Sequence, residues 1–161
     1  MPCFRRWDAS DEYYTPYYAI KPLLPFLPRR AVIWECAWGT GRLARHLARA
    51  GYRVVGGPEI NFYQRVPFKW DIIVTNPPYS CKDAFLRHAY TLGTPFAFLL
   101  PLEALAGKAR HGLFRHYGIQ LLIPSKRIEF SGGKTRFPCF TAWFTWGLNL
   151  PSPLTFVEAT W

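Results

Sequence analysis

A run of residues suited to binding a planar amine follows an apolar segment in the middle of the chain. Asn76-Pro77-Pro78-Tyr79 comes directly after the strand-like stretch at 71–75. The asparagine supplies a side-chain acceptor, and the two prolines have no N–H, so nearby carbonyl groups can face an external donor. Tyr79 offers a flat face for a ring. The run is either a proline-rich turn or, as its position favours, a site where an amine donates hydrogen bonds while its ring stacks on Tyr79.

A second candidate site is the glycine-containing turn at 35–41, which reads Glu-Cys-Ala-Trp-Gly-Thr-Gly. Gly39 and Gly41 let the backbone approach a ligand closely, and the N-terminus of a following helix attracts polar groups. The acidic Glu35 before the loop is suited to a cationic amine. Position 44 is alanine, so the dinucleotide pattern of glycines is absent, which disfavours NAD. A tight structural turn is the alternative.

Strands that alternate with helices predict a mostly parallel sheet with helices on both faces, and this sheet is expected to position the two motifs. Apolar runs predict strands, helical periodicity predicts helices, and Gly51 marks a helix end. At the N-terminus, Thr15 is expected to cap a short helix that starts at Pro16. Only about 15 residues separate the second strand from Asp71, too few for the usual helical crossover and a further strand, so the sheet is expected to be trimmed there. The expected strands are 31–36, 52–56, 71–75, 95–100, 119–123 and 137–146, and the expected helices are 42–50, 82–92 and 102–117, the last broken near Gly107.

These motifs resemble those of the class I S-adenosylmethionine-dependent amino-methyltransferases, especially the N6-adenine branch of phage and restriction systems with an Asn-Pro-Pro-Tyr motif. The resemblance covers most of residues 13–146 and implies a Rossmann-like α/β fold. It also implies one methyltransferase domain over 1–161, in which 1–30 cover the cofactor and no separate target-recognition domain is present. S-adenosylmethionine would be the cofactor. The implied cofactor-binding residues are Tyr14, Thr15, Pro16, Glu35, Ala37, Gly39, Gly41, Glu59, Asn61 and Asn76, and the implied catalytic residues are Asn76, Pro77, Pro78 and Tyr79.

Departures from the family pattern lie in the segment after the second strand. Pro58 stands beside Glu59, the expected ribose ligand, where a plain acidic turn is usual. Asn61 stands where the family has aspartate near the adenine of the cofactor. The exact ribose and adenine contacts between Gly57 and Phe62 are therefore left open.

The expected substrate side combines an aromatic pair with a basic loop. Tyr79 is expected to stack on one face of the target base and Phe130 on the other, with core packing as the alternative for Phe130. The loop at 125–136 carries two glycines and several cations, so it is suited to gripping a phosphate backbone, although it could also be a solvated loop. Its expected contacts are Lys126, Arg127, Lys134 and Arg136.

Composition supports one basic globular domain. The 161 residues are 50% hydrophobic, and 20 Lys+Arg against 10 Asp+Glu give a formal charge of +10. This excess favours a nucleic-acid partner, DNA ahead of RNA. Four widely spaced cysteines and the lack of a signal-like or membrane-spanning segment predict reduced thiols in the cytoplasm, the host's if the chain is phage-encoded. No metal site and no membrane partner are expected.

The function expected from these features is methyl transfer to N6 of adenine in DNA. Three alternatives remain: N6-adenine methylation of RNA, methylation of a glutamine side-chain amide in a protein, and a non-catalytic subunit that keeps the fold. Since the chain has no room for a separate domain that reads a target sequence, a homodimer or a partner subunit is the alternative source of recognition.

Overall fold

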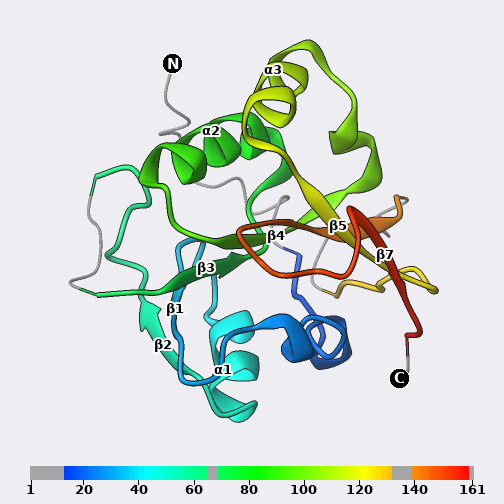
Figure 1. Cartoon of the computed structure of the whole chain (residues 1–161). Coiled ribbons are helices and arrows are strands. Elements are labelled where there is room, and N and C mark those ends of the chain that lie inside the picture. Colours follow the sequence, from blue (N-terminus) through cyan, green and yellow to red (C-terminus); the bar gives the residue numbers. More distant parts are fainter. Residues whose placement is uncertain (1–12, 65–68, 132–138, 160–161) are drawn as a thin grey trace.

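The computed structural model describes residues 13–64, 69–131 and 139–159, and Figure 1 shows its arrangement. The α-helices are α1 (Arg42–Arg49), α2 (Lys82–Leu92) and α3 (Lys108–Tyr117). The strands are β1 (Val32–Glu35), β2 (Arg53–Gly56), β3 (Ile72–Thr75), β4 (Phe96–Pro101), β5 (Gln120–Pro124), β6 (Thr141–Trp146) and β7 (Leu154–Val157). Short 3-10 turns are η2 (Tyr17–Ala19), η3 (Leu24–Phe26), η4 (Tyr79–Cys81) and η5 (Leu102–Leu105).

The strands form one mixed sheet in the order β2-β1-β3-β4-β6-β5-β7. The pairs β1–β2, β1–β3, β3–β4 and β5–β7 are parallel, whereas β6 runs antiparallel to both β4 and β5. The Rossmann-like α/β class, with a mostly parallel sheet, is therefore confirmed. In the described chain β2 is an edge strand, in agreement with the sheet being trimmed on that side.

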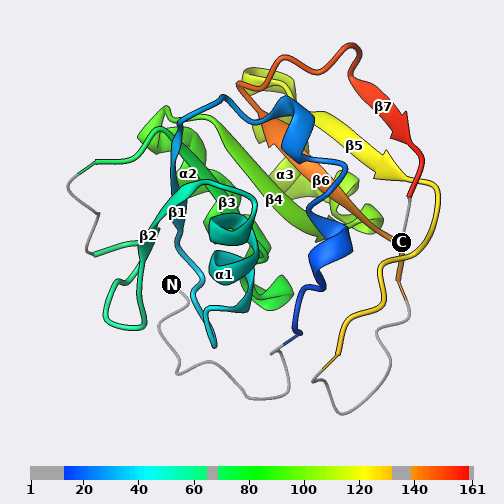
Figure 2. The same ribbon diagram turned by 90° about the horizontal axis from the view of Figure 1, so that it is seen from below.

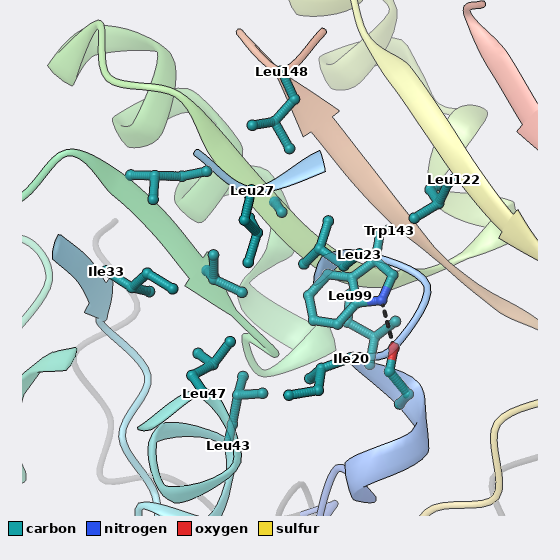
Figure 3. Close-up of a cluster of buried hydrophobic side chains, with 14 of the residues drawn as sticks. Ile20, Leu23, Leu27, Ile33, Leu43, Leu47, Leu99, Leu122, Trp143 and Leu148 are labelled. Atoms are coloured by element: carbon teal, nitrogen blue, oxygen red, sulfur yellow. Dashed lines mark hydrogen bonds between the residues drawn. The ribbon is translucent and has the colours of Figure 1, made fainter. Parts of the chain in front are cut away.

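Two hydrophobic layers cover the two faces of the sheet. Helix α1 and the N-terminal turns pack on one face, and α2 and α3 cover the other (Figures 1 and 2). On the first face Leu23, Leu47 and Leu99 lie within the buried cluster drawn in Figure 3. Trp143 of β6 belongs to this cluster, and its indole N–H donates to the carbonyl of Ala19 at 2.8 Å. That bond fastens the N-terminal segment to the sheet.

Most of the predicted elements are present, with α2 matching in both bounds. The break expected near Gly107 in the helix at 102–117 is confirmed, since Gly107 has φ 128° directly before α3. The part before the break is the 3-10 turn η5 and not an α-helix. The strand expected at 137–146 begins only at Thr141 as β6. The described residues 139 and 140 precede it outside the strand, and residues 137 and 138 lie outside the described ranges.

Three details correct the expectations. The helix expected at Pro16 is only the 3-10 turn η2, and Thr15 makes no cap, because its hydroxyl binds Asn76 instead. Strand β7 was not expected. Cys36 and Cys139 are free thiols, but Cys81 is disulfide-bonded, so the expectation of four reduced cysteines is wrong at this position.

In the part of the chain that the structure describes, no helix is both long and apolar enough to cross a membrane.

Candidate functional site

The two predicted motifs meet where the path of the chain reverses across the sheet. From β1 the chain passes to β2 on one side, then returns to β3 on the other side of β1. In open α/β sheets the crevice at such a reversal, beyond the carboxyl ends of the strands, is the usual ligand position. Glu35 is the last residue of β1 and Thr75 the last of β3, so the loop at 35–41 and the run at 76–79 both begin at this edge.

Glu35 is a buried carboxyl group held by two donors. Only 2% of the residue is exposed, and its Oε1 accepts from the N–H of Ala37 at 3.0 Å and from the Thr75 hydroxyl. Burial raises the pKa of Glu35 to about 7, although both hydrogen bonds act to lower it. A carboxyl group in this state gains strongly from a neighbouring cation, which favours the ionised form.

The glycine loop is shaped around the indole ring of Trp38. Gly39 and Gly41 have φ of 50° and 72°, which favours glycine at both positions. A Cβ atom on Gly41 would lie 2.8 Å from the Trp38 Nε1 atom. At the end of β2, a Cβ on Gly56 would lie 2.3 Å from the Glu35 carbonyl oxygen and 2.9 Å from the same indole. The ring of Trp38 thus packs against Gly41 and Gly56 and so connects the loop to the end of β2.

Asn76 uses the two ends of its amide differently. Its Nδ2 donates to the Thr15 hydroxyl at 3.1 Å and to the Tyr13 carbonyl at 3.4 Å. Its Oδ1 atom is buried and has no hydrogen-bond partner within the described ranges. The following Pro77 and Pro78 are buried and bring no N–H group to it. The site therefore presents an acceptor that lacks a donor, next to a backbone without donors.

Three aromatic rings gather beside this acceptor. The ring of Tyr79 stacks on that of Tyr13, with centroids 6.4 Å apart and planes 14° apart. Tyr13 in turn meets Phe130 edge-on at 6.1 Å. Tyr79 and Phe130 thus belong to one aromatic group, in which Tyr13 contacts both rings. Burial raises the pKa of the Tyr79 hydroxyl, and Tyr13, Cys139 and Glu103 raise it further, so this phenol stays protonated at neutral pH.

The N-terminal segment is held over the site by the strand-like residues at 129–131. The N–H of Tyr14 donates to the Ser131 carbonyl at 2.8 Å. The hydroxyl of Tyr18 accepts from the Glu129 N–H at 3.0 Å and donates to the Glu129 carbonyl at 3.2 Å. These contacts fix Tyr13 and Thr15 next to Asn76, although more than 60 positions separate them in the sequence.

The remaining predicted residues lie farther along the same loops. Glu59 and Asn61 are exposed after β2, and the Asn61 Oδ1 accepts from the N–H of Tyr63 at 2.9 Å. Lys126 is exposed and Arg127 partly buried after β5. Lys134 and Arg136 lie outside the described residues.

Two residues of the site were not expected from the sequence. Thr75 directly precedes Asn76, so its place at a strand end was a usable signal. Tyr13 has no comparable signal, because its ring contacts come from residues distant in the sequence. Among the described residues, no three histidine, cysteine or acidic side chains are grouped as they would be to hold a metal ion.

Comparisons with known proteins find similarity only to solved structures. No protein-family model and no curated protein matches the sequence. The fold is similar to the crystal structure of a predicted O-methyltransferase from Agrobacterium tumefaciens, with a TM-score of 0.44 and 12% sequence identity, over 88% of this chain and 85% of that one. This similarity is too low to identify a family, so the function has to be inferred from the residues of the site.

Proposed function

We propose that this protein is an S-adenosylmethionine-dependent methyltransferase that acts on an amino nitrogen, with N6 of adenine in DNA as the favoured target. The observation that carries the proposal is the buried Asn76 Oδ1 without a donor. Leaving a buried acceptor without a partner costs roughly 1–3 kcal/mol. Among the buried side-chain atoms of the described residues that have no partner, Asn76 Oδ1 is the one oxygen that can only accept, and it follows directly after β3 at the strand ends. An amine of the substrate would supply the missing hydrogen bond.

The residues on the β1 side fit the proposed cofactor. The buried Glu35 carboxyl, with its pKa raised to about 7, would be ionised and stabilised by the ammonium group of the methionine portion. The loop at 37–41 follows β1, and the segment at 14–16 contacts Asn76 at the end of the neighbouring strand β3; these two segments would hold the rest. When bound, S-adenosylmethionine supplies a methyl group on a positively charged sulfur.

The residues on the β3 side would orient the acceptor nitrogen. Asn76 Oδ1 and the Pro77 carbonyl oxygen would accept two hydrogen bonds from the amine and turn its lone pair away from the protein, toward the methyl group. The contribution is then one of positioning and electrostatics, and no strong base is required. The proton that the methylated nitrogen must lose can pass to water.

The aromatic group supports a planar substrate. Tyr79 and Phe130 would contact the target base, which has to leave the stack of a duplex at a cost of roughly a few kcal/mol. Because Tyr13 stacks on Tyr79, a base that uses this face has to displace the Tyr13 ring. A single-stranded or mismatched site would need less energy to present its base.

The proposal is tested by identifying the methylated product. The purified protein is incubated with S-adenosylmethionine and with unmethylated DNA or RNA, and the digested nucleosides are identified by mass spectrometry. N6-methyldeoxyadenosine is the expected product. A product in RNA alone would overturn the substrate, and the absence of a methylated nucleoside in both would direct the test to glutamine side chains of proteins.

The matched variant is Asn76→Ala. It should lose turnover while it retains cofactor binding, measured by calorimetry, and a normal thermal transition. Loss of cofactor binding with the fold intact would show that Asn76 does not have the role assigned here. An unmodified protein that binds no S-adenosylmethionine would support the alternative of a non-catalytic subunit.

A further inference from the structure

One side of α1 presents three arginines. Arg42, Arg45 and Arg49 are spaced three and four residues apart, so they project from the same side of the helix, and all three are exposed. The opposite side of α1 buries Leu43, Leu47 and the intervening alanine against the sheet. We call the three arginines the α1 arginine stripe.

Each guanidinium of the stripe is held in place without being neutralised. Arg42 lies over the ring of Tyr14 at 4.6 Å and Arg49 over the ring of Tyr17 at 5.0 Å. Arg45 donates to the Thr40 carbonyl oxygen at 2.9 Å. Within the described ranges none of the three forms an ion pair with a carboxylate. The ion pair found there joins Asp83 and Arg110 on the other face of the sheet. The stripe is therefore ordered and carries its full positive charge.

Cations outnumber acidic residues in the described chain around the stripe, which also includes the exposed Glu129 two residues before Ser131. Residues 13–58 hold seven lysines and arginines, all exposed, and their one acidic residue is the buried Glu35. The stripe also acts on its neighbour His46, whose pKa is lowered by burial and further by the three arginines. A surface with this concentration of one sign attracts a polyanion.

The stripe is continuous with the candidate site. Arg42 also donates to the Ser131 hydroxyl at 3.4 Å, and the backbone of Ser131 pairs with that of Tyr14. The next residue back along the chain, Tyr13, stacks on Tyr79. Figures 1 and 2 show the blue N-terminal segment beside α1, on the same face of the sheet.

We propose that the α1 arginine stripe binds the phosphate backbone of the nucleic acid whose target base enters the Asn76 site. This inference rests on the proposed function for the kind of polyanion, and it adds the surface along which the strand lies. Arginine is suited to the task because its planar fork donates two hydrogen bonds to one phosphate. The stripe spans roughly 10 Å along the helix axis, which is enough for two or three consecutive phosphates of one strand.

The test measures the salt dependence of binding to a fluorescein-labelled 20-nucleotide single strand of DNA, by anisotropy and without cofactor. The triple variant Arg42→Gln, Arg45→Gln, Arg49→Gln removes the stripe. The matched control Arg87→Gln, Lys108→Gln, Arg115→Gln removes the same charge from exposed positions on α2 and α3, on the opposite face.

Loss of three phosphate contacts should reduce the slope of log affinity against log salt by about 2 units, at roughly 0.7 per contact. At low salt the affinity of the stripe variant should fall by at least tenfold, while the control changes slope by less than half a unit. The single variant Arg45→Gln covers the case in which the triple variant folds poorly, because within the protein it loses only one hydrogen bond to a carbonyl oxygen. It should reduce the slope of log affinity against log salt by about 0.7.

Equal losses in the stripe variant and the control would overturn the inference, because they would show that only net charge matters. Binding to vesicles that contain phosphatidylglycerol, in the absence of binding to the oligonucleotide, would overturn it in favour of a membrane. The readout needs no turnover. A stripe-specific loss of slope in a protein that methylates no nucleic acid would refute the proposed reaction and leave the stripe as a phosphate-binding surface. Methylation unaffected by the stripe variant would instead support the reaction and overturn the role of the stripe.

Discussion

The most discriminating prediction concerns the protonation of Glu35. Its pKa of about 7 means that the carboxyl is half ionised at neutral pH and mostly protonated below pH 6. If Glu35 binds the cofactor amine, the ligand binds only the ionised form. The affinity should therefore be roughly fifteenfold weaker at pH 5.5 than at pH 7, since the ionised fraction falls from about one half to about 3%. The cofactor amine itself titrates near 8, so this pH window isolates the carboxyl group.

The assay is isothermal titration calorimetry with S-adenosylhomocysteine, which carries the same amine and no transferable methyl group. Repeating the titration in buffers of different ionisation enthalpy counts the protons released. About half a proton should leave at pH 7, and close to one at pH 5.5. Glu35→Gln should bind weakly, with the same affinity at both values. The assignment of Glu35 is refuted if the unmodified protein shows no pH dependence, or if the glutamine variant shows the same dependence.

The same pKa has a consequence for stability without a ligand. The native state holds the Glu35 proton more tightly than the unfolded chain, whose pKa is near the ordinary 4.5. The stabilisation is therefore complete below pH 4.5 and is lost as the pH rises through about 7, by about 3 kcal/mol in total. Relative to the unmodified protein, Glu35→Gln should gain free energy of unfolding between pH 4.5 and pH 8. Urea denaturation of both proteins at both values measures this gain, and the other titrating groups cancel in the difference.

Three further predictions test the parts that hold the site. Gly41→Ala should lower the free energy of unfolding more than Gly51→Ala does, because both glycines have positive φ but only Gly41 is crowded by the Trp38 ring. Backbone strain alone should cost each variant roughly 1–3 kcal/mol. Equal losses of the two variants in urea denaturation would contradict the crowding. Trp143→Phe should cost roughly 1–3 kcal/mol by leaving a buried carbonyl without its donor, and Trp146→Phe less, since its bond is exposed. Tyr13→Ala should lower the KM for the nucleic acid by freeing one face of the aromatic group; a raised KM would mean that Tyr13 is part of the substrate site.

Much of the framework was predictable because the central strands of a sheet covered on both faces are continuous apolar runs. The residues of β3 and β4 are all buried, and both strands were predicted close to their observed bounds. Strand β7 could not be predicted from the sequence because it is short, follows Pro151 and Pro153, and exposes the side chains of Leu154 and Phe156. Such an edge strand lacks the burial signal on which the prediction depends.

The parts of the site that were not predictable are those made by contacts between distant residues. Thr15 has the residue type and position of a helix cap, and the sequence alone favoured that role. Its hydroxyl accepts from Asn76 instead, and this bond could be found only once the sheet had brought the N-terminal segment to the end of β3. Likewise the loop glycines suggested room for a ligand, whereas Gly41 is required by the chain's own Trp38.

The bond between Thr15 and Asn76 also explains how the acceptor stays available. An asparagine amide can rotate, and in a polar pocket its oxygen would turn toward the nearest N–H or hydroxyl donor. Because Thr15 and the Tyr13 carbonyl bind the amide nitrogen, the oxygen is held away from them and has no donor among the described residues. The fold thus leaves one buried acceptor atom, Asn76 Oδ1, without a partner. The N-terminal segment fixes the direction of this atom through its contacts with the amide nitrogen. That arrangement has little value for stability, and the proposed binding of an external amine would give the acceptor its missing donor.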